Sequence, residues 1–81
     1  MVSIQIKMKT EYTIQSGFNK DHILFHQIIK DGKPFCGFAE GYPFNYVKER
    51  KYLSEVVEAH ATALKNNSAI KSIEKKVEVE E

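Results

Sequence analysis

The sequence predicts an α+β domain in which one amphipathic helix packs on one face of an antiparallel sheet, in the order β-β-β-α-β. Three observations lead to this prediction. The N-terminal stretch alternates apolar and polar residues, an Asp-Gly pair separates two further apolar runs, and residues 45–66 repeat apolar side chains at helical spacing. A chain of 81 residues leaves room for a single domain, which we place over residues 1–81.

The first predicted strand covers residues 2–15, "VSIQIKMKTEYTIQ". Its even positions are apolar except for Thr10, and its odd positions carry no apolar residue. Because side chains alternate between the two faces of a strand, one face is expected to meet the core and the other to meet water. The polar and glycine-containing "SGFNKD" at 16–21 predicts a turn after this strand.

The next element is a predicted hairpin centred on Asp31-Gly32, with arms over 22–30 and 33–42. Aspartate and glycine both tolerate the positive φ angles of a tight hairpin turn. A helix over 22–30, starting after Asp21 and ending before Gly32, is the alternative for the first arm. The strand is favoured because its isoleucines and phenylalanine are typical of strands and because it gives the Asp-Gly pair a role.

The predicted helix begins after Pro43, with Asn45 as its N-cap, and ends at Asn66-Asn67. Its apolar face carries Leu53, Val56, Val57, His60, Ala61 and Leu64, while Glu55, Glu58 and Lys65 point away. Residues 71–81 alternate isoleucine and valine with lysine and glutamate, which predicts a charged edge strand or a partly ordered tail.

One helix is too narrow to cover a whole sheet of three or four strands, because a helix with its side chains is about 10–12 Å wide and strands lie about 4.8 Å apart. The long first strand therefore predicts a surplus apolar strip. We expect this strip to meet a protein partner or a second copy of the chain in a homodimer, which would also stabilise a small domain.

The charges are balanced along the chain, with a formal net charge of +1. Eleven of the twelve basic residues are lysines, and only Arg50 has the planar guanidinium that reads guanine or grips phosphate bidentately. Nucleic-acid binding is therefore possible but less favoured, and the lysine-, isoleucine- and asparagine-rich composition suggests an AT-rich bacterial or viral genome. The single Cys36 excludes an internal disulfide, and no apolar run reaches the length of a membrane span, so a cytoplasmic location without membrane contact is expected.

Few residues of the sequence are candidates for a metal site or a catalytic site. His22 and His26 would lie about 13 Å apart on a strand, too far to share a metal ion. Cys36 could pair with a histidine in a small enzyme, but no nucleophile motif surrounds it. His60 is interpreted as a histidine at the border of the core whose polar edge reaches water, with a pH-sensitive interface contact as the alternative. We expect no catalytic residue, no metal site and no cofactor.

The most informative local feature is a cluster of aromatic residues between positions 35 and 46, followed by the basic sequence "KERK" at 48–51. These aromatic side chains could fill the core beneath the helix, anchor a protein partner, or stack nucleobases. We take the cluster and its cations as candidate partner-binding residues: Phe35, Phe38, Tyr42, Phe44, Tyr46, Lys48, Arg50 and Lys51.

The sequence thus favours a small non-catalytic regulatory, inhibitory or accessory protein that acts by protein–protein binding. An RNA- or single-stranded nucleic-acid-binding protein that uses residues 35–46 and nearby lysines is the first alternative. A small enzyme that uses Cys36 with a histidine is the second.

Overall fold

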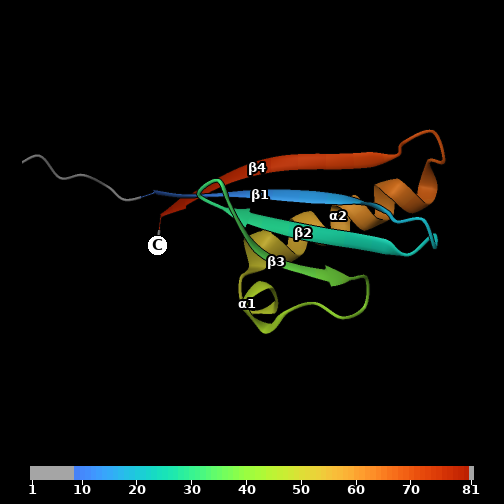
Figure 1. Ribbon diagram of the computed structural model, residues 1–81. Helices are drawn as coiled ribbons and strands as arrows, with labels where there is room; N and C mark the ends of the chain where they lie inside the picture. Colours follow the sequence, from blue (N-terminus) through green and yellow to red (C-terminus); the bar gives the residue numbers. More distant parts are fainter. Residues whose placement is uncertain (1–8, 81) are drawn as a thin grey trace, which may run out of the picture.

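The computed structural model describes residues 9–80 and confirms the α+β class, with an antiparallel four-stranded sheet in the order β3-β2-β1-β4. Both helices follow β3 and precede β4, so the helical connection carries the chain from one sheet edge to the other (Figure 1). Helix α2 lies behind the sheet in Figure 1. The elements are β1 (Lys9–Phe18), β2 (Leu24–Lys30), β3 (Lys33–Ala39), α1 (Asn45–Lys48), α2 (Lys51–Asn66) and β4 (Ser72–Glu80).

Strand β1 continues to Phe18, so the predicted turn at 16–21 is wrong in its position. Ser16 pairs with His26 on one side and with Ile73 on the other, and this double pairing extends the strand beyond the polar "SG". The turn instead covers residues 19–23. The first part of the predicted strand, residues 2–8, lies outside the described residues.

The Asp31-Gly32 hairpin is confirmed. Asp31 has φ 49° and Gly32 has φ 79°, the two left-handed conformations that a tight hairpin turn requires. The Asp31 carboxylate also accepts a hydrogen bond of 3.0 Å from the backbone N–H of Glu11. Residues 24–30 form a strand, so the alternative helix over 22–30 is wrong. The second arm ends at Ala39 rather than at Tyr42, because Gly41 turns the chain at φ 89°.

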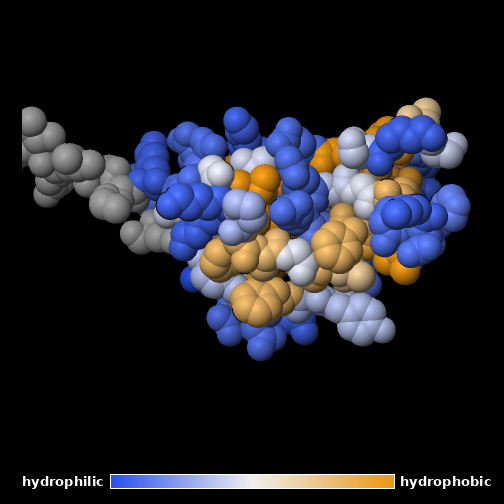
Figure 2. Space-filling model, viewed as in Figure 1, coloured by the Kyte–Doolittle hydropathy of each residue, from blue (hydrophilic) through white to orange (hydrophobic). Residues whose placement is uncertain are grey.

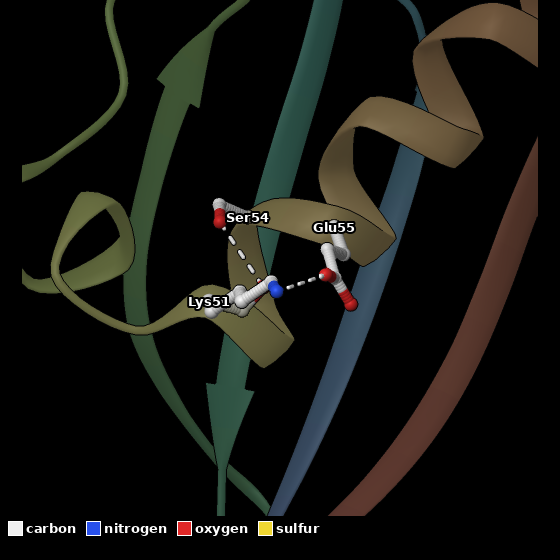
Figure 3. A network of polar contacts seen from close by, with 3 residues as sticks. All are labelled: Lys51, Ser54 and Glu55. Atoms are coloured by element: carbon white, nitrogen blue, oxygen red, sulfur yellow. Dashed lines mark hydrogen bonds and ion pairs between the residues drawn. The ribbon is translucent and has the colours of Figure 1, made fainter.

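The predicted single helix is divided into α1 and α2 at Arg50, whose backbone is extended at φ −112° and ψ 102°. Asn45 is the first residue of α1 and not its N-cap, which is Phe44 without a side-chain cap. In the first turn of α2, the Ser54 hydroxyl donates to the Lys51 carbonyl over 3.1 Å, and Lys51 Nζ lies 3.6 Å from Glu55 (Figure 3). This ion pair is exposed, so it contributes little to stability.

The core lies between α2 and the helix-facing side of the sheet. The predicted apolar face of α2 is confirmed for Leu53, Val56, Ala61 and Leu64, which are buried, whereas Val57 lies at the edge of the core and is only half-buried. They meet sheet residues at every second position, mainly Tyr12, Ile14, Leu24, Ile28 and Phe38. The part of the predicted apolar strip that the structure describes, Tyr12 and Ile14, is fully covered.

The opposite face of the sheet, which we call the open face, carries no helix (Figure 1). Figure 2 shows that hydrophilic side chains cover β4 on this face, while hydrophobic side chains gather over β2 and β3. Thr13, expected to meet water, is only 7% exposed because it lies between Ile29 and Lys76 of the flanking strands. Among the helices of residues 9–80, none has the length and hydropathy needed to span a membrane.

Candidate functional site

The structure separates the predicted aromatic cluster into buried and exposed parts. Phe38 is buried, and its ring centroid lies 5.4 Å from that of the buried His26. Phe38 therefore fills the core, as one of the three interpretations predicted, and its side chain is not accessible to a partner. It points to the helix side because it pairs in register with His26, whose side chain lies on the same face.

Phe35, Tyr46 and Arg50 come together beside α1. The Phe35 and Tyr46 rings meet edge to face with centroids 4.7 Å apart. The Arg50 guanidinium carbon lies 3.4 Å from the centroid of the Tyr46 ring, and Arg50 also donates to the Tyr46 carbonyl over 3.2 Å. Lys30 Nζ lies 5.4 Å from the Phe35 centroid and 5.6 Å from that of Tyr46. Cation–π contacts of this kind rigidify an aromatic anchor.

Tyr42 and Phe44 lie on the loop between β3 and α1, where their side chains project into solvent. Tyr42 is 80% exposed and Phe44 is 53% exposed. Large aromatic side chains that remain exposed on a small domain are typical of interaction sites.

The predicted cations Lys48 and Lys51 are exposed, at the end of α1 and the start of α2. Neither helix has an acidic residue in its first turn. A lysine at a helix N-terminus is repelled by the positive end of the helix dipole, so the position of Lys51 is unfavourable with respect to the dipole of α2. We call the exposed and half-buried members of this group the aromatic-basic surface: Phe35, Tyr42, Phe44, Tyr46, Lys48, Arg50 and Lys51.

A second polar group, which we did not predict from the sequence, is buried in the core. The Ser16 hydroxyl lies 2.6 Å from His26 Nδ1 and 2.9 Å from His60 Nδ1. These three side chains are 3%, 0% and 5% exposed. His60 is therefore not the border histidine that we expected, because the sheet closes over it. The periodicity of the sequence could have indicated this network, because it places Ser16, His26 and His60 at core-facing positions of their strands and helix. Buried polar side chains need hydrogen-bond partners, so these three could have been expected to bond to one another.

The hydrogen bonds of this Ser16–His26–His60 network require at least one neutral imidazole, because one Nδ1 must accept the hydroxyl proton. A hydroxyl can donate its one proton to one Nδ1 and accept a hydrogen bond from the other. Burial lowers the pKa of His26, and the charge of His60 lowers it further, whereas Glu40 opposes the shift. Burial also lowers the pKa of His60, with Lys75 acting in the same direction. His26 Nε2 is buried without a hydrogen-bond partner, so an added proton there would have no acceptor.

The remaining candidate groups are Cys36, His22 and His26. Cys36 is half-buried, and burial raises the pKa of its thiol, which disfavours the reactive thiolate. His22 lies in the exposed turn while His26 lies in the core. Within residues 9–80, no group of three or more His, Cys, Asp or Glu side chains is arranged to hold a metal ion.

Comparisons of the chain with models of protein families, with curated proteins and with solved structures gave no match.

Proposed function

We propose that this protein acts by binding a protein partner through the aromatic-basic surface, as a non-catalytic regulatory, inhibitory or accessory protein. The observation that carries the proposal is the exposure of Tyr42 and Phe44 on the loop that leads into α1, whose last turn carries the exposed Lys48. Aromatic side chains and arginine are the residues that most often dominate binding energy at protein interfaces. A lone cysteine is compatible with action in the reducing cytoplasm.

The chemistry of the surface favours a partner segment that is both apolar and acidic. Phe35 and Tyr46 form a rigid aromatic pair, since Arg50 packs on the Tyr46 ring. Lys48 is exposed at the end of α1 and would meet an incoming carboxylate. Complementary charge accelerates association and excludes wrong partners, while the aromatic anchors supply affinity.

Two observations favour a protein over nucleic acid. Strand β3 offers only Phe35 as an exposed aromatic side chain, because Phe38 is buried. The open face of β4 carries Glu74, Glu78 and Glu80 against Lys76, and this acidic excess would repel a phosphate backbone. We therefore expect no binding of a labelled single-stranded RNA at physiological salt.

A second copy of the chain is an additional candidate partner, supported by the open face. Phe25 alternates with the buried Leu24 and His26, so it points to this face, where it is 43% exposed. The Phe25 ring lies over Gly37, where an added Cβ would come within 3.0 Å of it. Light scattering tests this candidate, since the monomer has a mass of 9.3 kDa. A dimer that Phe25→Ser dissociates would support it, and a monomer at high micromolar concentration would refute it.

The main proposal is tested by partner capture with matched variants. Wild-type protein, a Phe44→Ser/Lys48→Glu variant and an Ile23→Ser control are used as baits, followed by quantitative mass spectrometry. Ile23 is a suitable control because it is 48% exposed, close to the 53% of Phe44, but lies in the turn after β1. We expect the same partner with wild type and control and its loss with the double variant. Equal capture by all three baits would contradict the proposal.

A further inference from the structure

A hollow lies at the C-terminal end of α2, away from the aromatic-basic surface. It has a volume of about 600 Å³, within the range of roughly 300–1,000 Å³ that small-molecule sites occupy. Three segments that are distant in sequence line it: the end of β1 with its turn, the last turn of α2, and the link from α2 to β4. We call this hollow the α2-end pocket and define it by Phe18, His22, Leu64, Lys65, Ile70 and Lys71.

The floor of the α2-end pocket is apolar. Leu64 is only 2% exposed and packs in the core with Leu24 and Ala61, and the half-buried Ile70 packs against this cluster. Phe18 forms a more open wall, with 43% of its surface exposed. An aliphatic chain placed against these three side chains would leave water without displacing a core residue.

The other lining residues are cationic or polar. Lys65 and Lys71 supply two ammonium groups, and none of the described residues that line the pocket is acidic. Lys65 is ion-paired with Glu40, whereas no ion pair holds Lys71 among residues 9–80. Lys71 thus carries a positive charge that no ion pair compensates, next to the apolar floor of the pocket. This charge is complementary to an anionic head group.

The walls of the pocket are held by local hydrogen bonds. Asn19 Oδ1 accepts the backbone N–H groups of Asp21 and Ile23, which fixes His22 in a left-handed conformation at φ 60°. In the opposite wall, Asn67 Oδ1 accepts the N–H of Ala69 over 3.1 Å. A pocket whose loops are already ordered loses less entropy when a ligand binds.

Close packing between two strands places Lys71 at the rim. Gly17 of β1 pairs with Ser72 at the start of β4. A Cβ at Gly17 would lie only 3.3 Å from the Lys71 carbonyl oxygen, so the absence of a side chain allows this approach. Lys71 therefore lies directly before β4, where the link from α2 is held close to β1.

We propose that the α2-end pocket binds a free aliphatic carboxylate of medium chain length. The chain packs against Leu64, Ile70 and Phe18, and the carboxylate pairs with Lys71. This inference is independent of the proposed protein-binding function, because the two sites share no residue. Each methylene of the ligand that enters the pocket is expected to raise affinity by up to about fourfold, until the aliphatic chain is longer than the apolar floor.

The experiment is a titration of isotopically labelled protein with decanoate at pH 7.5, below its micelle concentration, followed by NMR. We expect saturable shifts centred on Leu64, Ile70 and Lys71, at least fivefold weaker binding of decanol, and still weaker binding of decylammonium. Lys71→Glu should weaken decanoate binding at least fivefold. Lys33→Glu, an exposed lysine in the hairpin at the other end of the sheet, should leave it unchanged.

Melting curves of both variants show whether each is folded before its affinity is compared. An Ile70→Ser variant tests the apolar floor separately and should weaken the binding of decanoate and of decanol to the same extent. Equal affinities for decanoate and decanol, equal losses in Lys71→Glu and Lys33→Glu, or binding only to anionic lipid vesicles would overturn the proposal. The absence of any saturable shift would also overturn it.

Discussion

Acidification from pH 7.5 to 5.5 should destabilise this protein, because burial of His26 and His60 in the Ser16–His26–His60 network disfavours their protonated forms. The pKa of both His26 and His60 is lowered in the folded state, chiefly by burial. In the unfolded chain each imidazole takes up its proton near its ordinary pKa of about 6.5, so below that pH the unfolded state binds more protons. Stability is therefore fully present above about pH 6.5 and is lost as pH falls toward the folded-state pKa values.

The expected magnitude follows from linkage. Over the pH range in which a histidine is protonated in the unfolded chain but neutral in the folded protein, each drop of one pH unit lowers the free energy of unfolding by about 1.4 kcal/mol. Between pH 7.5 and 5.5 the two histidines together can therefore remove up to about 2.7 kcal/mol from the free energy of unfolding. That is a large part of the roughly 5–15 kcal/mol typical of a small domain. Perturbed carboxylates titrate mainly below about pH 5, so this window reports the histidines.

The assay is urea unfolding monitored by circular dichroism at pH 7.5, 6.5 and 5.5, with two variants. His60→Gln should roughly halve the dependence of stability on pH, whatever its stability at pH 7.5. His22→Asn is the control, since His22 lies in the exposed turn at φ 60° and asparagine tolerates that conformation. A free energy of unfolding that is constant between pH 7.5 and 5.5, or a slope that changes in His22→Asn but not in His60→Gln, would refute the reasoning.

Three further changes test individual parts of the fold by thermal and urea unfolding. Gly32→Val should cost more than about 1 kcal/mol, because a β-branched residue resists the φ of 79° there, and an unchanged melt would contradict the tight turn. Leu64→Ala should cost about 2–4 kcal/mol while Glu58→Ala stays within about 0.5 kcal/mol, and equal losses would mean that the faces of α2 are misassigned. Ser16→Ala should cost about 1–3 kcal/mol at pH 7.5, because it leaves the Nδ1 atoms of two buried histidines without a partner, whereas the exposed Ser68→Ala should be silent.

The features that the sequence determined by itself are local ones. The Asp31-Gly32 turn depends on the φ angles that two adjacent residues tolerate, and the structure has both in the left-handed region. The buried face of α2 depends on the spacing of apolar residues along one helix, and Leu53 and Leu64 lie on it as predicted. The hairpin makes β2 and β3 antiparallel neighbours, because a two-residue turn joins antiparallel strands. None of these inferences needs knowledge of what lies across the core.

The end of β1 and the division of the helix were decided by contacts between distant segments. Ser16 and Gly17 have the composition of a turn, but β2 and β4 pair with both of them and keep them in the sheet. Arg50 interrupts an otherwise helical sequence, and its guanidinium packs on Tyr46 and bonds to the Tyr46 carbonyl. Local propensity predicts neither outcome, because tertiary pairing outweighs differences of well under 1 kcal/mol per residue.

The candidate sites also depended on tertiary structure. Phe38 and Phe44 belong to one aromatic cluster in the sequence, yet Phe38 fills the core while Phe44 remains exposed. Ser16, His26 and His60 each occupy a core-facing position that local periodicity identifies, but only the packing of α2 on the sheet shows that they are partners. Periodicity assigns a side chain to a face, whereas the identity of its neighbour depends on register and on how the helix crosses the strands.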